Sequence, residues 1–353
     1  MKKPTAIQGY NQTVTDACER VLVTLIRHLG PWRDSIFLVG GLTPRYLIKE
    51  RPPAVPAYAG TGDVDVVVDM KLLSDTEAYR TLEDNIRAIG FKRSVNDEGK
   101  RLSWRWQQEL VDGTVLILEF LTDAGDEKGG ALQELPAEGA VSAIHIPHSA
   151  MVMDHFETVD ITAELLSDGG VTTETIRHAD IVSFTCLKAF AFDHPAEPKD
   201  AHDLCYCLEH YKGGTEALRS ELEAALAGKH AETVKAAIDI LARRFCDGDG
   251  FEGYQKDGPV AAARFEGAEE WNPDNRTLRQ RDLSASFRMP SRHSSDLGLV
   301  ELGACRTELH RPIPVRARGR SRRGPRRRRL GLRPKPWLSL RPGICPLRVG
   351  RAS

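Results

Sequence analysis

The regular spacing of apolar residues that runs through most of this chain stops after Asp282. Before that point, apolar residues recur at spacings typical of helices and strands. After it come eight of the 20 prolines and an almost unbroken basic run, Arg318–Arg329. A segment without periodic apolar residues buries too little surface to offset the entropy that is lost on ordering. We therefore expect the folded part of the chain to lie within residues 1–283.

Charge divides the chain at the same place. Residues 284–353 contain 17 arginines, one lysine and three acidic residues, a net charge of +15. Residues 1–283 contain 31 basic and 47 acidic residues, a net charge of -16, so the overall charge of -1 averages two opposite segments. We interpret residues 284–353 as a disordered tail and favour an out-of-frame translation product, because its composition suits a GC-rich gene read in the wrong frame. A basic arm that neutralises nucleic-acid phosphates and a solvated extension are the alternatives.

The chain shows no sign of a membrane segment or an exported protein. Its apolar stretches are only a few residues long, far short of the ~20 that a membrane-spanning helix needs. Met1-Lys2-Lys3 is followed by the polar stretch Pro4–Thr13 rather than by the apolar core of a signal peptide. We expect a cytoplasmic protein that does not contact membranes.

The folded part divides into an α/β half and a helical half. Apolar runs typical of strands cover residues 35–39, 64–68 and 114–121, with weaker candidates at 140–146 and 158–165. From about Ala179 the spacing becomes helical and continues to Phe245. We therefore predict an α/β domain over residues 1–170, a helical domain over 171–283 and the tail over 284–353.

Three features of the α/β half carry chemical information. Gly40-Gly41 follows the first strand, Asp63-Val64-Asp65 begins the second, and Glu119 lies within the third. Because side chains alternate along a strand, Asp63 and Asp65 are expected to share one face. Glu119 stands in an otherwise apolar run, where a carboxylate is costly to bury unless it is paired or bound to a metal.

These residue types suit phosphoryl chemistry. Carboxylate oxygens are the ligands that Mg²⁺ prefers, and two such ions ~4 Å apart stabilise both the attacking and the leaving oxygen of a phosphoryl or nucleotidyl transfer. A Gly-Gly turn removes side chains where backbone N–H groups must approach a triphosphate. The pattern therefore predicts a site for a nucleoside triphosphate (NTP) and Mg²⁺.

In this order the motifs resemble the polymerase-β-like nucleotidyltransferase superfamily, whose signature is Gly-Gly or Gly-Ser, then Asp-x-Asp, then a later acid. The sequence looks closest to the abortive-infection (AbiEii-type) toxin nucleotidyltransferases and their uncharacterised relatives. The resemblance extends over about residues 35–211, more faintly to 282. The matching segments are Leu38–Gly41, Gly60–Asp65, Leu118–Phe120, Lys188 and Lys199–Asp203.

The resemblance implies a mixed sheet with flanking helices and a helical domain that closes over the nucleotide. It also implies roles for the matching residues. Gly40, Gly41 and Thr61 would bind the triphosphate, and Asp63 and Asp65 would hold two Mg²⁺ ions, with Glu119 completing the metal site or acting as a base. Lys188, Lys199, Asp200 and Asp203 would reach or border the phosphates from the helical domain.

Two departures from the family's pattern are expected to weaken the binding of phosphate. The gap between Gly41 and Asp63 is longer than usual and contains a proline-rich loop, and His194-Pro195 stands where relatives often carry an arginine. The implied reaction is transfer of a nucleoside monophosphate to a hydroxyl of RNA, of a protein or of a small molecule. Members of such systems usually work with a cognate antitoxin.

Simpler interpretations remain open for each residue type. The Gly-Gly pair could be an ordinary turn, Asp-x-Asp a solvated strand end, and Lys188 a surface lysine. Lys199 and Asp203 could form an ordinary helical ion pair. A different class of hypothesis is a non-catalytic nucleotide- or nucleic-acid-binding module whose basic tail contacts RNA or DNA. Cys205 and Cys207 are expected to be buried thiols, because positions i and i+2 of a helix do not share a face.

Overall fold

The computed structural model describes most of the chain between Pro4 and Phe287. The described residues are 4–69, 76–96, 98–110, 113–125, 129–134, 141–166, 169–193, 197–248, 250–267 and 270–287. They all belong to one compact unit, Met1–Arg306. The interpretations of the tail beyond residue 287, and the departure at His194-Pro195, lie outside these residues.

The architecture is mixed α/β, as the sequence predicts. The α-helices of the described residues are α1 Gln12–Leu29, α2 Pro44–Leu47, α4 Thr76–Ala88, α5 Ile181–Asp193, α6 Pro198–His210, α7 Thr215–Ala225, α8 Ala231–Phe245, α9 Asp257–Phe265 and α10 Pro273–Ser286. The strands are β1 Ile36–Val39, β2 Asp63–Val68, β3 Lys92–Val95, β4 Arg101–Glu109, β5 Val115–Asp123, β6 Leu132–Glu134, β7 Ser142–Ile146, β8 Phe156–Glu164 and β9 Val171–Ala179.

Among the described residues, the strands form one nine-stranded mixed sheet in the order β3-β4-β5-β2-β1-β9-β8, with β7 pairing the far end of β5 and β6 pairing β7. β1 is antiparallel to β2, whereas β2 is parallel to β5 and β1 is parallel to β9. The register places Asp65 opposite Val39 on one side and opposite Glu119 on the other. The three strands expected to carry the chemistry are therefore neighbours in the centre of the sheet.

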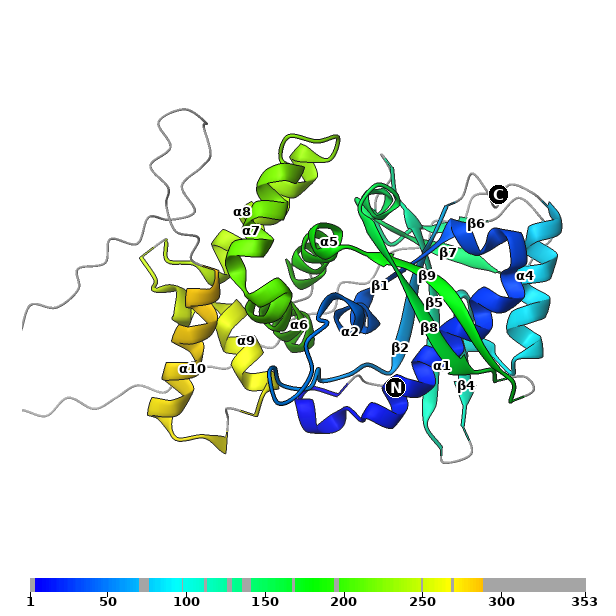
Figure 1. Cartoon of the computed structure of the whole chain (residues 1–353), viewed down its shortest axis with the longest axis horizontal. Coiled ribbons are helices and arrows are strands. Elements are labelled where there is room, and N and C mark those ends of the chain that lie inside the picture. The colour runs from blue at the N-terminus through cyan, green and yellow to red at the C-terminus, as the bar shows by residue number, and fades with distance from the viewer. Residues whose placement is uncertain are drawn as a thin grey trace, which may run out of the picture. The chain divides into compact units, whose positions relative to one another are not determined.

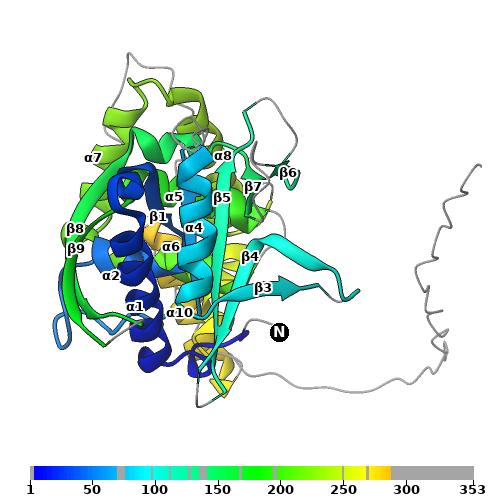
Figure 2. The same cartoon turned by 90° about the vertical axis from the view of Figure 1, so that its right-hand side faces the viewer.

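The two faces of the sheet are covered by different helices (Figures 1 and 2). On one face, α1 and α4 bury the alternate side chains of the central strands, among them Leu38, Val64 and Leu118. The apolar residues of α1 recur at helical spacing, and the side chain of Asn11 accepts a hydrogen bond from the Thr13 N–H at the start of this helix. The opposite face packs against the helical half of the chain through Phe37, Val39 and Val67. Asp63, Asp65 and Glu119 lie on this second face, because each alternates with a residue of the first.

The helical half differs from the predicted range 171–283 at both ends. It is preceded by β9, which fills residues 171–179 and pairs with β1 and β8. At the other end α10 continues past residue 283, and Ser284 and Phe287 are buried. The Phe287 ring stacks on Phe245 with 4.0 Å between centroids, and the Ser284 hydroxyl donates to the Phe245 carbonyl at 2.9 Å. The packed residues therefore continue to Phe287, four residues past the expected boundary at residue 283.

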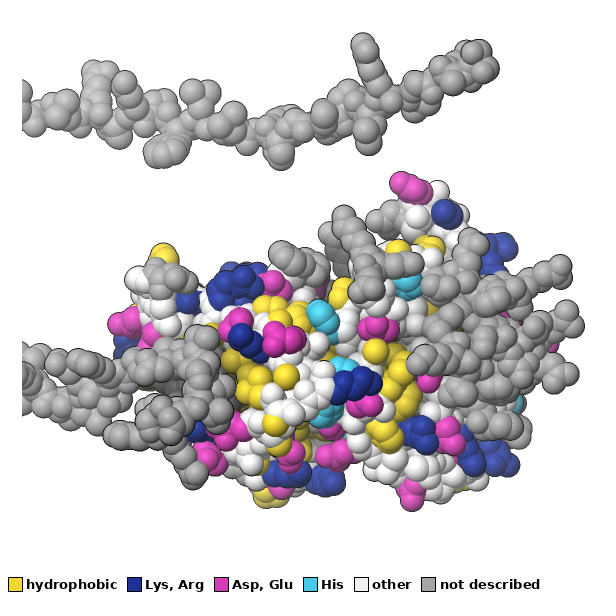
Figure 3. Space-filling model, turned by 90° about the horizontal axis from the view of Figure 1, so that it is seen from above, with side chains coloured by type: hydrophobic (Ala, Val, Ile, Leu, Met, Phe, Trp, Pro, Cys, Tyr) yellow, Lys and Arg dark blue, Asp and Glu magenta, His cyan; other side chains and the backbone are white. Residues whose placement is uncertain are grey.

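The surface mixes charges of both signs. The view from above shows histidine, acidic and basic side chains interspersed with apolar ones on the middle of that face (Figure 3). Within the described part of the chain, no helix has both the length and the apolar character needed to cross a membrane.

Candidate functional site

The two aspartates of β2 lie where this strand begins, directly beside the glycine turn that ends β1. Asp63 is buried, with 9% of its surface exposed, and Asp65 is half-buried. Two residues apart on one strand, they share a face, as expected. Glu119 stands beside Asp65 on the parallel strand β5, so the three carboxylates occupy adjacent positions of the sheet.

The glycine turn lies against the aspartates more closely than any other residue type would allow. Gly40 has a φ of +69°, and a Cβ built on it would overlap the carboxylate of Asp65. A Cβ on Gly41 would come within 2.6 Å of the Thr61 hydroxyl and 3.3 Å of the Lys199 ammonium. Both glycines are therefore required by contacts within the candidate site, and an ordinary turn would not explain this pair of contacts.

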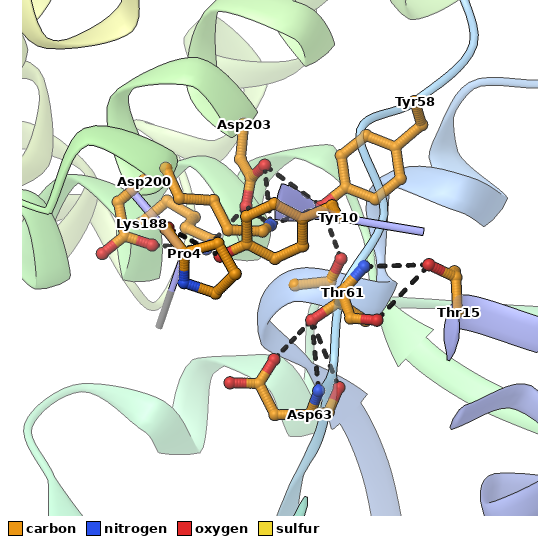
Figure 4. Close-up of polar contacts among 11 residues, drawn as sticks. Pro4, Tyr10, Thr15, Tyr58, Thr61, Asp63, Lys188, Asp200 and Asp203 are labelled. Carbon is orange, nitrogen blue, oxygen red and sulfur yellow. Dashed lines mark hydrogen bonds and ion pairs between the residues drawn. The ribbon is translucent and has the colours of Figure 1, made fainter. Parts of the chain in front are cut away.

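Thr61 holds the start of β2 in place (Figure 4). Its hydroxyl donates to the carboxylate of Asp63. Its backbone N–H donates to the hydroxyl of Thr15 on α1 at 3.0 Å. Asp63 is thus oriented by a side chain that is itself anchored to a buried helix, which restricts the directions the carboxylate can take.

Glu119 has a partner that the sequence did not reveal. Arg105 lies opposite Glu119 on the antiparallel strand β4, and its Nε is 3.2 Å from Glu119 Oε1. Both side chains are largely shielded from solvent, with 29% and 15% exposed. The sequence shows an arginine at position 105, but only the register of β4 against β5 identifies Glu119 as the residue that it faces.

The predicted lysines and aspartates of the helical half form one buried cluster. Lys188 of α5 donates to Asp200 at 2.6 Å and lies 2.9 Å from Asp203. Lys199 contacts the same Asp203 at 2.8 Å, one helical turn away on α6. Lys188 is 8% exposed and Asp203 is fully buried, so Lys188 is not a surface lysine and the Asp203 pair is not an ordinary surface ion pair.

The charges in this cluster stabilise one another. Burial alone would lower the pKa of Lys188, but Asp200 and Asp203 outweigh it and raise that pKa well above the ordinary value. Burial would likewise raise the pKa of Asp203, yet Lys188 and Lys199 hold it below the ordinary value. Both shifts favour the charged forms of Lys188 and Asp203, and the cluster pairs two lysines with two aspartates.

Tyr58 joins this cluster to the glycine turn. Its hydroxyl lies 2.6 Å from the carbonyl oxygen of Gly41 and 3.1 Å from Asp203 Oδ1, and it accepts a hydrogen bond from Lys199 at 2.7 Å. Burial, followed by the charge of Asp203, raises the pKa of Tyr58 well above the ordinary value. Tyr58 belongs to the proline-rich loop between α2 and β2, the segment that appeared as an unusual insertion in the sequence. Figure 4 shows Tyr58, Asp203 and Lys188 together on one side of Thr61, with Asp63 on the other.

The carboxylates suit a hard cation by their chemistry. Asp63, Asp65 and Glu119 offer oxygen ligands on adjacent positions of one sheet face, and the Asp65 carboxylate occupies the space that the absent side chain of Gly40 leaves. In the described residues, however, no three His, Cys, Asp or Glu side chains are grouped closely enough to hold a metal ion as they stand. The donor types therefore suit a hard cation such as Mg²⁺, which Asp63 and Asp65 would hold, whereas Glu119 is paired with Arg105.

A cavity of about 230 Å³ opens beside Asp63. It lies between the segment that precedes α1, the start of β2 and the β4–β5 hairpin. Thr61, Asp63 and Arg105 line it together with Tyr10. The Lys199 ammonium is 5.4 Å from the centre of the Tyr10 ring, so this ring connects the cavity to the cluster of lysines and aspartates. No sequence signal marked Tyr10, which stands two residues before α1 in a short polar stretch.

Several other cysteine, histidine and tryptophan side chains pack within the fold. Cys205 and Cys207 are buried free thiols, and burial raises the pKa of each well above the ordinary value. The His148 ring stacks on Phe190 with 4.7 Å between centroids. Trp106 is fully buried in the core beneath α4.

The models of known protein families and the curated proteins provide no match to this chain.

Proposed function

We propose that this protein is a Mg²⁺-dependent nucleotidyltransferase that moves a nucleoside monophosphate from an NTP to an acceptor hydroxyl. The observation that carries the proposal is the contact between the glycine turn and the Asp-x-Asp strand. Gly40 lies against Asp65, Gly41 lies against Thr61 and Lys199, and Asp65 is in register with Glu119. The adjacency of a glycine turn, three carboxylates and a lysine of the helical half supports this proposal.

In this proposal the triphosphate binds at the glycine turn. The missing side chains of Gly40 and Gly41 let the backbone approach phosphate oxygens closely. The Lys199 ammonium beside Gly41 adds positive charge there, held in place by Tyr58 and Asp203. Lys188 contributes through Asp203, which it orients from the neighbouring helix.

The reaction would begin with attack of the acceptor oxygen on the α-phosphorus. A P–O bond forms to the acceptor while the bond from the α-phosphorus to the bridging oxygen breaks, and pyrophosphate leaves with the electron pair. The acceptor proton passes to the carboxylate of Glu119, which Arg105 keeps oriented. Asp63 and Asp65 would hold Mg²⁺, which when bound supplies positive charge to the reacting phosphate.

The acceptor is a hydroxyl of RNA, of a protein side chain or of a small molecule such as an aminoglycoside. The resemblance to abortive-infection toxins adds that the protein acts as a toxin and is neutralised by a cognate antitoxin. That part of the proposal rests on analogy between families rather than on any residue of the site.

A second function is favoured by one feature of the site. Glu119 is paired with Arg105, and Lys188 and Lys199 are paired with Asp200 and Asp203. A site whose charges are already balanced suits a module that binds a nucleotide or nucleic acid without transferring it. The two functions differ in whether label moves from the nucleotide to an acceptor.

The test is to incubate the full chain with α-³²P-labelled NTPs, Mg²⁺ and, separately, total RNA, cell protein and an aminoglycoside. Nucleotidyl transfer predicts labelled acceptor with the parent and a loss of at least 100-fold in Asp63→Asn and Asp65→Asn. Asp69→Asn, at the other end of the same strand, is the matched control and is expected to retain activity. Equal labelling by the parent and the Asp63→Asn variant would refute catalysis at this site. Nucleotide binding without labelling by either protein would support the binding module.

A further inference from the structure

We propose that the cavity beside Asp63 is a pocket for a nucleobase. The inference rests on the proposed function, because the base would belong to one of its two substrates: the NTP itself or a nucleotide acceptor. The pocket would recognise the base of a substrate. The glycines, carboxylates and lysines of the sequence motifs do not supply this recognition.

Three separate segments build the pocket. Pro4, Gly9 and Tyr10 come from the stretch before α1, Gly62 and Asp63 from the start of β2, and Thr114, Val115 and Ile117 from the β4–β5 hairpin and β5. Ile117 of β5 lies opposite Asp63 of β2 in the sheet, so the sheet face that carries this carboxylate also forms the floor of the pocket. A ring bound on this floor therefore lies next to the residue expected to hold the metal.

The pocket walls suit a flat ring. Tyr10 provides an aromatic wall, and Val14, Val115 and Ile117 provide apolar ones. The Tyr10 ring is fixed by the Lys199 ammonium 5.4 Å away and by Phe265, whose ring centre is 5.6 Å distant. Bases stack on such aromatic side chains irrespective of sequence, because every base has a π-face.

The polar groups of the pocket suit a neutral ligand with mixed donors and acceptors. Asn11 and the Thr114 hydroxyl are groups that can both donate and accept hydrogen bonds, and the Thr61 hydroxyl, which donates to Asp63, can act as an acceptor. Asn11 uses its side-chain oxygen to accept from the Thr13 N–H at 2.8 Å, and its amide nitrogen takes no part in that bond. The charged groups of the lining, Asp63 and Arg105, have opposite signs. An ion of either sign would meet one repulsive partner, whereas a base would not.

The volume sets the size of the ligand. At about 230 Å³ the cavity is smaller than the roughly 300–1,000 Å³ of pockets for drug-sized molecules, so it accepts one ring system rather than a chain or an oligosaccharide. The cavity therefore matches a single nucleobase in size, whichever of the two substrates carries it.

Gly62 offers a way to fill the pocket without disturbing the fold. A Cβ built on Gly62 meets only one atom within 4 Å, Val14 Cγ1 at 3.9 Å, and Val14 also lines the pocket. Gly62→Leu is therefore expected to fold normally and to place its side chain in the cavity, and Gly62→Ala is a smaller step in the same direction. Tyr10→Ala removes the aromatic wall, and Tyr254→Ala, on a tyrosine outside the pocket, is its matched control.

The test measures binding of the four ribonucleosides to the full chain by equilibrium dialysis up to millimolar concentration. Nucleosides carry no phosphate, so their binding depends neither on the glycine turn nor on a metal. We expect binding of at least one nucleoside, weakened about tenfold or more by Tyr10→Ala and by Gly62→Leu, and unchanged by Tyr254→Ala. Circular dichroism of each variant establishes that it is folded. If Tyr10→Ala fails to fold, the Gly62 pair decides the result.

Competition distinguishes the two sources of the base. If the pocket holds the base of the NTP, the nucleoside displaces a bound NTP and Gly62→Leu weakens NTP binding by a similar factor. If it holds the base of the acceptor, nucleoside and NTP bind together and Gly62→Leu leaves NTP binding unchanged. Absence of nucleoside binding, or binding insensitive to both Gly62→Leu and Tyr10→Ala, would overturn the pocket. The labelling experiment with Asp63→Asn would still test the proposed function independently.

Discussion

The carboxylate of Asp65 lies against the α-carbon of Gly40, in the space that any other side chain would occupy. Gly40 also has a φ of +69°, a conformation that costs other residues ~1–2 kcal/mol. These two constraints act on different properties. The φ angle affects stability, whereas the contact with Asp65 affects the geometry of the carboxylates.

Gly40→Ala is therefore expected to reduce label transfer by about 100-fold, because its methyl group displaces Asp65 and a shift of ~1 Å at a reacting site can have this effect. Gly99→Ala is the matched control, since Gly99 has a φ of +81° and no atom lies within 4 Å of a Cβ built there. It should lose a similar ~1 kcal/mol of stability in urea unfolding and keep its activity. Equal activity of the two variants would show that the Gly40–Asp65 contact has no part in the reaction.

Asp203 is expected to be the most important charge for stability in the helical half. It is fully buried and pairs with both Lys188 and Lys199. Asp203→Asn leaves both ammonium groups in the buried cluster without this charge, and should lower the free energy of unfolding by ~3–5 kcal/mol. Asp200→Asn, at a carboxylate with 19% of its side chain exposed, should have a smaller effect of ~1 kcal/mol. Urea unfolding of both variants measures the difference, and a larger effect at Asp200 would contradict this assignment.

Acid should destabilise the protein through Glu266. Burial would raise the pKa of Glu266, but hydrogen bonds from Arg279 outweigh it, and the pKa falls to about 2 from an ordinary value of 4.5. Because the folded-state pKa is lowered, the stabilisation is present above about pH 4.5 and is lost as the pH falls towards 2. A shift of this size corresponds to about 3 kcal/mol.

Urea unfolding at several pH values between 6 and 3 measures this contribution. Glu266→Gln should be less stable than the parent at pH 6, with the difference shrinking as the pH is lowered. Glu223→Gln is the control, because Glu223 forms an ion pair with 51% of its side chain exposed and such pairs contribute ~0–1 kcal/mol. A constant difference between the Glu266→Gln variant and the parent across this range would exclude the proposed linkage.

The end of the folded part is set by Phe287. Because its ring is buried against Phe245, Phe287→Ala should lower the free energy of unfolding by ~3–5 kcal/mol. A chain that stops at Asp282 should lose at least as much, since it also lacks the bond from Ser284 to Phe245. Thermal unfolding of both proteins checks this.

The same packing limits where a frame shift could lie, since a change of frame before codon 288 would replace residues that fit the core. Resequencing the gene beyond that codon tests it, and a change of frame found at or before codon 283 would contradict this view of Phe287.

The sequence predicted the elements that have strong local patterns. Strands β1, β2 and β5 were expected close to their observed bounds, and helices α5, α6, α7 and α8 lie within the range expected to be helical, because periodicity and turn residues mark them. β9 was missed because its buried and exposed positions include Thr and Glu rather than a run of apolar residues. α10 was missed because its residues are mostly polar and only its last turn is buried.

The candidate site could be predicted only where its residues lie in motifs. Gly40, Asp63 and Asp65 were expected together because strand alternation and strand order place them there. Arg105, Tyr58 and Tyr10 depend on register and on loop paths that no local pattern encodes. The charge balance between Lys188, Lys199 and two aspartates was likewise invisible, because sequence spacing shows which residues share a helix face but not which helices meet.

The hydrogen bond from Tyr58 to the Gly41 carbonyl has a consequence for motion. The same hydroxyl contacts Lys199 and Asp203 on α6, so a single oxygen atom connects the turn of the sheet to the helical half. Any hinge that opened the two halves would have to break hydrogen bonds of this hydroxyl. We therefore expect the two halves to move together, so that access to the proposed site depends on small local displacements rather than on a large movement of one half.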